Sequence, residues 1–350
     1  MQSCLSSHAT RFVHDQSSHY IGFLPTWGDK VLRWWGEGPE IFTPENAEIY
    51  GRFLGKRYGT RPNIIWVLGG DRAAEREHDF AVWRAMARGI KAGEATNENG
   101  FSHLMTYHPP DSRSSSEFFH NDDWLDFNMF HTGHNHKDGA SYRLAARDYS
   151  IEPVKPTLDG EPPYDNHPVR RDPTRTQWFD DFDVRQVAYW SIFSGAFGHT
   201  YGCHDIWQMY DGTPERQCTD ARTPWKQAVD LPGAWQMRIL RSLMLDKRLL
   251  TDGNVPFQEL LVGDNPEGAG YVAICVTRNR ERAFVYVPTG RSIVLDLSKL
   301  NLTGTPKFVL FNPRTGETTS EIDIMKDGNF YAVTFPGREE RGNDWVIIVE

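Results

Sequence analysis

The chain has 350 residues, 39% of them hydrophobic and 24% charged, and its net charge is -9 with a pI near 5.8. This length allows one large domain followed by a small one, and the composition is that of a globular protein. The acidic balance and the lack of a basic stripe argue against nucleic acid as a partner, because phosphate binding needs clustered Lys and Arg. No apolar run approaches the roughly 20 residues of a membrane span, so a membrane partner is not expected either.

The N-terminal residues lack the basic and then apolar pattern of a signal peptide, so they leave the localisation open. Residues 1–19 contain one short apolar cluster, Phe12-Val13, and we expect this segment to be irregular. Four cysteines are too few for a disulfide scaffold. Cys203 and Cys218 flank a loop and are compatible with a pair in an oxidising compartment, but free buried thiols are the simpler interpretation.

From about residue 20 to residue 250, strand-like apolar runs alternate with helical patterns. After the first run, Thr43 and Pro44 predict the start of a helix, because Thr caps a helix well and Pro suits its first turn. The strand-like runs are 20–24, 64–68, 103–108, 124–129, 154–158 and 197–202. Alternation at roughly 25–45 residues per unit indicates a parallel sheet with helices outside it.

From about residue 255 the pattern changes to β runs without helices between them. Turn signals such as 288–290 and 312–316 separate these runs. We therefore expect an α/β domain over residues 1–254 and a small antiparallel β-sandwich over residues 255–350.

Two strand-like runs end at glycine and then a carboxylate. Residues 64–68 lead through Gly69 and Gly70 to Asp71, and residues 154–158 lead through Gly160 to Glu161. In a parallel barrel, the C-terminal ends of the strands gather at one face and carry the catalytic groups. Two such carboxylates suffice for glycoside hydrolysis, since one protonates the leaving oxygen and the other attacks the sugar or activates water. The alternative is that Asp71 caps the next helix and Glu161 lies in a turn.

Further residues near these ends are candidates for substrate binding. Trp27 and Trp207 offer flat rings on which a sugar can stack, with ordinary loop packing as the alternative. Arg72 can pair with Asp71 or with a uronate carboxylate, or it forms a surface salt bridge. His108, at the end of its run, is a candidate for bonding the substrate or for orienting Glu161, and a structural histidine is the alternative.

Three histidines, His131, His134 and His136, follow the fourth strand-like run. Histidines at strand ends bind metals in some barrel hydrolases, but no H-x-H motif on an early strand accompanies them here. We therefore favour a sugar-hydroxyl contact by His134 and expect no metal and no cofactor. Asp159 lies two residues before Glu161, so on a strand both would face the same side, and Asp159 would be an electrostatic modulator or a turn residue.

At this point several strings of the sequence resemble the apiosidase-like glycoside hydrolases of family 140. They run in order along the chain: Leu24–Lys30, Tyr50–Tyr58, Asn63–Arg72, Trp124–Met129, Lys155–Pro162 and Phe197–Gly202. The resemblance implies a (β/α)₈ barrel followed by a C-terminal β-sandwich, sometimes labelled collagen-binding. It also implies retaining, exo-acting hydrolysis of apiose linked to galacturonic acid in the pectic polysaccharide rhamnogalacturonan II, outside the cell or in the periplasm.

The resemblance also assigns roles to residues. It implies that Asp71 is the acid/base and Glu161 the nucleophile, which agrees with the choice made from strand ends. Asn128 and His199 lie in the matching strings and join the substrate-binding candidates. His131 stands where the resemblance predicts glutamine. For a retaining enzyme we expect the two carboxyl groups about 5–5.5 Å apart.

Only six strand–helix units are present where the family's barrel has eight. The chain begins where the third barrel strand is expected, so we predict a barrel that lacks its first two βα units and one wall of its pocket. A second hypothesis therefore stays open, in which a truncated homologue binds carbohydrate or protein without catalysis. The oligomeric state stays open as well.

Overall fold

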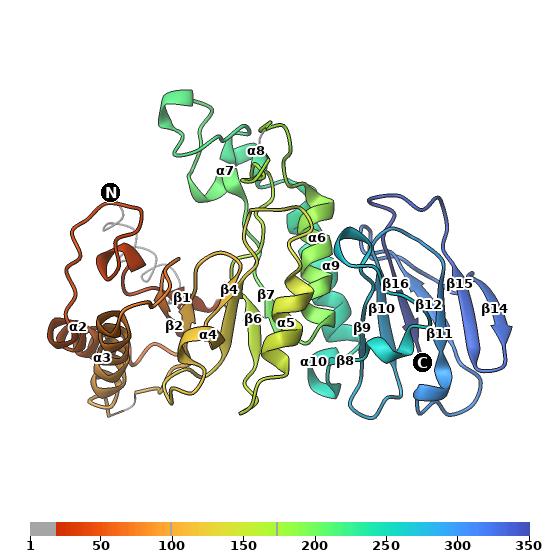
Figure 1. The fold of residues 1–350 in the computed structure, drawn as a ribbon, viewed down its shortest axis with the longest axis horizontal. Helices are drawn as coiled ribbons and strands as arrows, with labels where there is room; N and C mark the ends of the chain where they lie inside the picture. The colour runs from red at the N-terminus through yellow and green to blue at the C-terminus, as the bar shows by residue number, and fades with distance from the viewer. Residues whose placement is uncertain (1–18, 99, 173) are drawn as a thin grey trace. The chain divides into compact units, whose positions relative to one another are not determined.

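The computed structural model describes residues 19–98, 100–172 and 174–350, which form two compact units. The first unit contains the described residues up to Pro110 together with Glu117–Phe127, and the second contains Asp111–Ser116 and Asn128–Glu350 (Figure 1). The prediction of an irregular N-terminal segment falls outside the described residues, except for residue 19. Among the described residues, no helix combines the length and the apolar character needed to span a membrane.

The first unit is built on a parallel sheet of three strands in the order β1-β2-β3. Its strands are β1 (Ile21–Phe23), β2 (Ile64–Gly69) and β3 (Met105–His108). Strand β2 is buried along almost its whole length, as a central strand covered on both faces should be. The helical elements are η2 (Gly28–Lys30), α2 (Pro44–Tyr58) and α3 (Glu77–Glu94), while α4 (Ser116–Phe119) contains residues of both units.

Helix α2 begins as the sequence predicts. Thr43 accepts a hydrogen bond from the Asn46 N–H, Asn46 accepts one in return from the Thr43 N–H, and Pro44 is the first helical residue. Helices α2 and α3 pack through four glycines, two on each helix and four residues apart. A Cβ at any of them would lie 2.1–2.4 Å from a backbone oxygen of the other helix, at Gly51, Gly55, Gly89 and Gly93. These glycines permit a close helix contact that the sequence analysis did not anticipate.

The second unit carries a second sheet, in the order β4-β5-β6-β7. Strands β5, β6 and β7 are parallel, and β4 joins β5 in the antiparallel sense. The strands are β4 (Arg113–Ser114), β5 (Asn128–His131), β6 (Thr157–Asp159) and β7 (Gly198–His199). The helices are α5 (Ser141–Tyr149), α6 (Asp181–Phe193), α7 (His204–Trp207), η3 (Pro214–Arg216), α8 (Trp225–Ala228), α9 (Pro232–Asp246) and α10 (Leu249–Asp252).

The six parallel strands thus divide into three in each unit, and the mixed α/β character is confirmed. The predicted strand at 124–129 is wrong in its position, because β5 begins only at Asn128. The residues before it bond irregularly to β3 instead: Asp126 donates its N–H to the Met105 carbonyl, and Thr106 donates its hydroxyl to the Phe127 carbonyl.

Residues from 255 onward form two antiparallel sheets, which confirms the predicted antiparallel β structure. The larger sheet has the order β13-β12-β16-β10-β9-β8 and the smaller one the order β11-β15-β14. The bounds are β8 (Val255–Pro256), β9 (Ala273–Val276), β10 (Ala283–Val287), β11 (Ile293–Asp296), β12 (Phe308–Phe311), β13 (Thr318–Thr319), β14 (Asp323–Asp327), β15 (Phe330–Thr334) and β16 (Trp345–Val349), with 3₁₀ turns η4 (Gln258–Leu260), η5 (Gly268–Gly270) and η6 (Leu297–Lys299).

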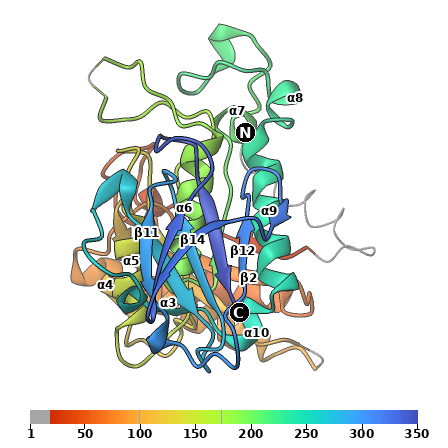
Figure 2. The same cartoon turned by 90° about the vertical axis from the view of Figure 1, so that its right-hand side faces the viewer.

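The central strands β9, β10 and β16 of the larger sheet are buried on both faces, and successive side chains of a strand alternate between two cores. Val285 and Ile347 face the core shared with the smaller sheet, whereas Phe284 and Ile348 pack in the core that contains α6 and α9. Figures 1 and 2 show these two helices beside the larger sheet. The sandwich therefore shares a hydrophobic core with the helices of the preceding α/β segment.

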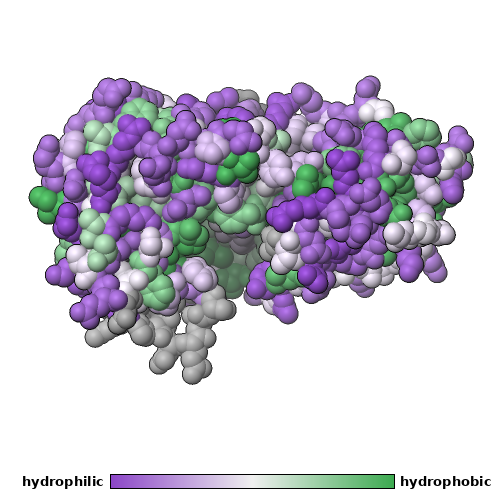
Figure 3. Space-filling view, turned by 90° about the horizontal axis from the view of Figure 1, so that it is seen from below, coloured by the Kyte–Doolittle hydropathy of each residue, from purple (hydrophilic) through white to green (hydrophobic). Residues whose placement is uncertain are grey.

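A buried ion pair reinforces this shared core. Arg185 of α6 donates to both carboxylate oxygens of Asp344, each at 2.8 Å, and Tyr286 donates its hydroxyl to the same carboxylate at 3.0 Å. The outer surface, in contrast, carries mainly polar side chains. The face drawn in Figure 3 is mostly hydrophilic with scattered hydrophobic side chains, as the globular composition predicts.

Candidate active-site residues

Asp71 lies on a sharply bent backbone at the end of β2. Gly69, Gly70 and Asp71 have φ angles of 86°, 117° and 61°, a region that non-glycine residues adopt only at a cost. The bend is also crowded, because a Cβ on Gly70 would lie 2.8 Å from the Gly28 nitrogen and one on Gly69 would lie 2.5 Å from the His108 oxygen. Both glycines are therefore required where they stand, and Asp71 is held at a fixed place by the main chain.

His108, at the end of the neighbouring strand β3, supports this bend. The Asp71 N–H donates to Nδ1 of His108 at 3.1 Å, so in the neutral ring the proton sits on Nε2. His108 is buried and therefore fixes the backbone of Asp71. Trp27 lies at the same strand end, with its ring centroid 6.0 Å from that of His108 and 39% of its surface exposed. The structure brings these three candidates together, and the roles of Trp27 and His108 toward a substrate stay predictions.

Arg72 has only 1% of its surface exposed, so the alternative of a surface salt bridge is wrong. Its guanidinium donates to the Asp71 carbonyl at 2.8 Å, to the Leu32 carbonyl at 3.1 Å and to the Trp35 carbonyl, and it stacks 4.1 Å from the centre of the Trp35 ring. Burial lowers the pKa of Arg72 from its ordinary value. Arg72 thus fastens the loop after β1 to the end of β2, and a contact with a uronate stays a prediction.

Glu161 follows β6 in the second unit, and hydrogen bonds of its own fix one of its carboxylate oxygens. Tyr164 donates its hydroxyl to Oε1 of Glu161 at 2.9 Å, and Nε2 of His134 lies 3.4 Å from the same oxygen. Nδ1 of His134 accepts from the Tyr164 N–H at 3.3 Å, which places the proton of the neutral ring on Nε2, toward Glu161. Two donors on one oxygen favour the ionised form of the carboxylate.

His131, at the end of β5, also faces this carboxylate, with its Nε2 3.7 Å from Oε1 of Glu161. Histidine and carboxylate together are possible metal ligands. In neutral His134, however, Nε2 carries the ring proton and points it at Glu161, so this nitrogen has no lone pair with which to bind a metal there. The hydrogen bonds of Tyr164 and His134 therefore account for this geometry with the carboxylate as acceptor.

Behind His134 stand two histidines that the sequence analysis missed. The ring of His167 stacks on His134 with centroids 4.1 Å apart, and His204 packs against His167 at 4.2 Å. Burial, as the largest cause, lowers the pKa of His134, lowers that of His167 to about 2 and lowers that of His204 to about 4. All three rings are neutral at pH 7. Trp207 donates its indole N–H to Nδ1 of His204 at 3.2 Å, so this exposed ring is attached to the same group.

Three further candidates lie deeper in the sheet. Asp159 is fully buried and accepts hydrogen bonds from Thr132 and from Ser191 of α6, at 2.8 and 2.9 Å. The strand ends at Asp159, so the expected alternation with Glu161 does not hold and Asp159 makes no hydrogen bond to Glu161. His199 of β7 pairs in register with Asp159, and its Nδ1 lies 3.6 Å from the carboxylate.

Asn128 is the first residue of β5, about 10 Å along the strand from the end that leads toward Glu161. It is fully buried there. The structure does not bring Asn128 to Glu161, and its part in substrate binding stays a prediction. The three described cysteines are free thiols, and Cys203 and Cys275 are buried. The expectation of a buried thiol is wrong for Cys218, which is exposed.

Comparison with known proteins gives two family matches. Residues 7–251 match the family described as "Apiosidase-like, catalytic domain", and residues 255–350 match the "Putative collagen-binding domain of a collagenase". No curated protein is significantly similar to the chain.

Two solved structures are similar over most of the chain. One, described as "Glycoside hydrolase", is 31% identical with a TM-score of 0.79 and covers 94% of this chain and 73% of its own. A glycoside hydrolase family 5 protein from Bacteroides vulgatus ATCC 8482 is 30% identical, also with a TM-score of 0.79, and covers 94% and 70%. A third, a putative glycoside hydrolase from the same organism, is 10% identical with a TM-score of 0.56, covers 95% of this chain and 59% of its own, and supports only the fold.

Proposed function

The chain belongs to the apiosidase-like family of glycoside hydrolases, and we propose that it is a retaining exo-glycosidase that removes apiose from galacturonic acid in pectic side chains. The observation that carries this proposal is the family match over residues 7–251, within which both strand-end carboxylates lie. In the proposal Asp71 is the acid/base, Glu161 is the nucleophile, and the substrate is a pectic oligosaccharide met outside the cell or in the periplasm. The six parallel strands found in the described residues would belong to a barrel of the (β/α)₈ type.

The chemistry follows from the two carboxylates. Glu161 attacks the anomeric carbon while Asp71 gives its proton to the leaving oxygen, so the glycosidic bond breaks as a glycosyl ester on Glu161 forms. Asp71, now ionised, then removes a proton from water as that water attacks the anomeric carbon and releases Glu161. The net result is the transfer of the glycosyl group to water with retention of configuration.

The surroundings of each carboxylate suit these roles. Tyr164 and His134 both direct protons at Oε1 of Glu161, which favours the charged form that a nucleophile needs. Because His134 is neutral at pH 7, it gives a hydrogen bond without adding a full positive charge beside the nucleophile. The bend at Gly69 and Gly70 holds Asp71 in a fixed place, which limits the reorganisation needed before proton transfer.

The direct test is incubation of the full chain with rhamnogalacturonan II, with chromatography to detect released apiose. The anomer formed first, followed by NMR, should match that of the substrate, and an experimental structure should place the two carboxyl groups about 5–5.5 Å apart. Release of the opposite anomer would contradict the retaining mechanism. Binding of the polysaccharide without any release of sugar would favour the second hypothesis, a homologue that only binds carbohydrate.

A further inference from the structure

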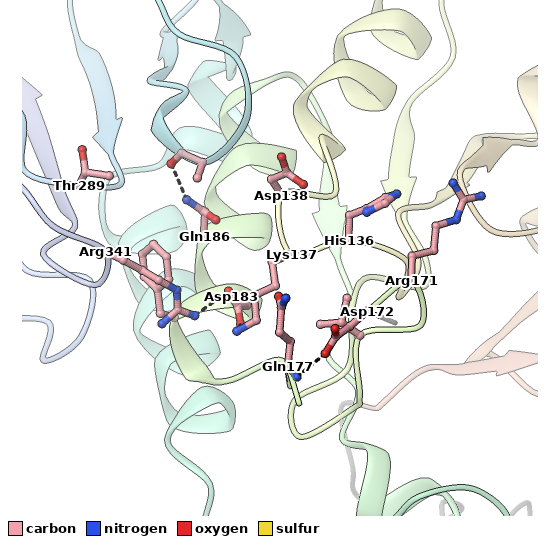
Figure 4. A pocket seen from close by; sticks show the side chains of 13 residues that line it. His136, Lys137, Asp138, Arg171, Asp172, Gln177, Asp183, Gln186, Thr289 and Arg341 are labelled. Carbon is pink, nitrogen blue, oxygen red and sulfur yellow. Dashed lines mark hydrogen bonds and ion pairs between the residues drawn. The ribbon is translucent and has the colours of Figure 1, made fainter. Parts of the chain in front are cut away.

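A pocket of about 420 Å³ lies within the second unit, and its lining comes from both the α/β segment and the β-sandwich (Figure 4). The α/β segment supplies the loop that follows β5, residues Val169, Arg171, Asp172 and Gln177, and the start of α6. The sandwich supplies Ala269, Thr289 and Arg341. The volume falls within the roughly 300–1,000 Å³ of small-ligand sites.

Several polar side chains in this lining have no partner among the described residues of the protein. His136, Asp138, Arg171 and Gln177 form no side-chain hydrogen bond or ion pair in the described ranges. The hydroxyl of Thr289 is buried and has no hydrogen-bond partner in the same part of the chain. The other four side chains are exposed to solvent, whereas leaving a buried group such as the Thr289 hydroxyl unsatisfied costs about 1–3 kcal/mol. The pocket therefore offers donors and acceptors that a ligand can satisfy.

The remaining charged groups of the lining form its rigid frame. Arg341 bonds Asp183 at 2.7 Å, Lys137 bonds the same carboxylate at 2.9 Å, and Gln186 donates to the Ala269 carbonyl at 3.0 Å. These bonds tie the loop after β5, helix α6 and the sandwich together, as Figure 4 shows for Asp183 and Gln186. The frame fixes the pocket before any ligand arrives, which lowers the entropic cost of binding.

The chemistry of the lining favours a sugar over a free anion. Three cationic residues, Lys137, Arg171 and Arg341, are balanced by three acidic ones, Asp138, Asp172 and Asp183. A balanced lining provides no strong field for a phosphate, whereas mixed donors and acceptors suit hydroxyl groups that act as both. Val169 and Ala269 add small apolar surfaces to the lining, while the ring of Phe182 is covered by Arg341, 4.6 Å from its centre.

The pocket is also linked along the chain to the residues around Glu161. The loop after β5 carries His134, which bonds Glu161, and two residues later His136, which lines the pocket. Backbone bonds align this loop with Arg170 and Arg171, since Arg170 donates to the His134 carbonyl at 2.9 Å and Arg171 to the Asn135 carbonyl at 3.3 Å. One loop thus serves both Glu161 and the pocket.

We propose that this pocket is a second glycan-binding site, which holds a sugar unit of the polysaccharide remote from the bond that is cleaved. The β-sandwich completes this site through Thr289 and Arg341, so it acts as part of the substrate-binding surface. The identity of the ligand as a glycan rests on the proposed function, but the binding itself does not depend on hydrolysis.

The test is calorimetric titration of the full chain carrying Glu161→Gln, which prevents cleavage, with rhamnogalacturonan II, with a galactan and with xyloglucan oligosaccharides as separate probes. We expect at least one probe to bind, the added pair Arg171→Ala and Gln177→Ala to weaken binding at least tenfold, and Thr289→Val to weaken it a few-fold. Arg278→Ala is the matched control, because this exposed arginine also lacks a side-chain partner among the described residues and does not line the pocket. Thermal unfolding verifies that each variant is folded.

Absence of binding by all three probes, or equal binding by the double variant, would overturn the proposal. Binding of triple-helical collagen peptide that the double variant loses, in place of glycan binding, would overturn it as well. Apiose release by the chain without substitutions is measured separately. Release that persists without pocket-dependent binding refutes the pocket alone, whereas pocket-dependent binding without release supports the pocket and refutes the proposed hydrolysis.

Discussion

The ends of β2 and β6 both present a carboxylate after glycine, but they hold it by different means. At the end of β2, the position of Asp71 is set by the main chain: three successive positive φ angles, two crowded glycines and a bond from the Asp71 N–H to His108. At the end of β6, the position of Glu161 is set by side chains, through Tyr164 and His134 on one oxygen. The bonds described at the end of β2 restrain the backbone of Asp71, and those described at the end of β6 restrain one carboxylate oxygen of Glu161.

This difference predicts which substitutions each end tolerates. An end held by the backbone should fail when a Cβ is added to it, even though no polar contact is lost. An end held by side chains should weaken when a single hydroxyl is removed, even though the backbone is unchanged. Four experiments separate the two cases.

The largest effect should follow from removing either carboxylate. Asp71→Asn and Glu161→Gln keep size and shape but lose the proton and the nucleophile, so we expect each to lower kcat for apiose release by roughly 10³-fold or more. Steady-state kinetics measure this effect, and thermal unfolding verifies that both variants are folded. Turnover close to that of the unsubstituted chain in both variants would refute the site assignment.

The next effect tests the backbone-held end. In Gly70→Ala the new Cβ would lie 2.8 Å from the Gly28 nitrogen at a φ of 117°, so we expect a loss of more than about 1 kcal/mol in unfolding free energy and a fall in kcat. Gly263→Ala is the matched control, because Gly263 also has a positive φ, 86°, but a Cβ there would meet nothing within 4 Å. Equal behaviour of the two variants in denaturant unfolding and kinetics would show that crowding at the bend plays no part.

The end of β2, which the backbone holds, was easier to predict from the sequence than the end of β6. An apolar run followed by Gly69, Gly70 and Asp71 signals a buried strand and then a turn, and the structure has both. The predicted bounds of strands were less accurate where irregular hydrogen bonds set them. Strand β5 begins at Asn128, later than predicted, because Asp126 and Phe127 bond to β3 irregularly and these bonds leave no periodic pattern in the sequence.

The residues around Glu161 at the end of β6 were predicted only in part. Glu161 and His134 were candidates, but His167 was not, because its ring contact with His134 joins two loops far apart in the sequence. Tyr164 lies only three residues after Glu161, but the loop has no period that would indicate that its hydroxyl turns back to the carboxylate. The helix contact of α2 and α3 differs from this case. Gly51 and Gly55 in α2 are four residues apart, as are Gly89 and Gly93 in α3, and this spacing is a helical signal present in the sequence itself.

A smaller effect tests the side-chain-held end. Tyr164→Phe removes the hydroxyl that donates to Glu161 at 2.9 Å and keeps the ring, so we expect kcat/KM to fall by about tenfold, which corresponds to roughly 1.4 kcal/mol. Tyr201→Phe is the control, since it removes a comparable hydroxyl bond at 3.0 Å, to Asp165. If both variants lose the same activity, the effect comes from general destabilisation and the Tyr164 bond has no special part.

The smallest effect concerns the neutral histidines behind His134. Burial lowers the pKa of His167 to about 2 and that of His204 to about 4, whereas an unfolded histidine titrates near 6.5. Between these values the unfolded chain binds more protons than the folded one, so the stability contribution of these rings is fully present above about pH 6.5 and is lost as the pH falls. Asp165 acts in the opposite sense, because burial raises its pKa to about 6, so its contribution to the stability of the fold is lost as the pH rises toward that value.

We therefore expect His167→Phe to flatten the fall of unfolding free energy between pH 6.5 and 5 by about one proton, and Asp165→Asn to steepen it. Denaturant unfolding across this pH range measures both slopes, and an unchanged slope in His167→Phe would mean that His167 is protonated in the folded protein.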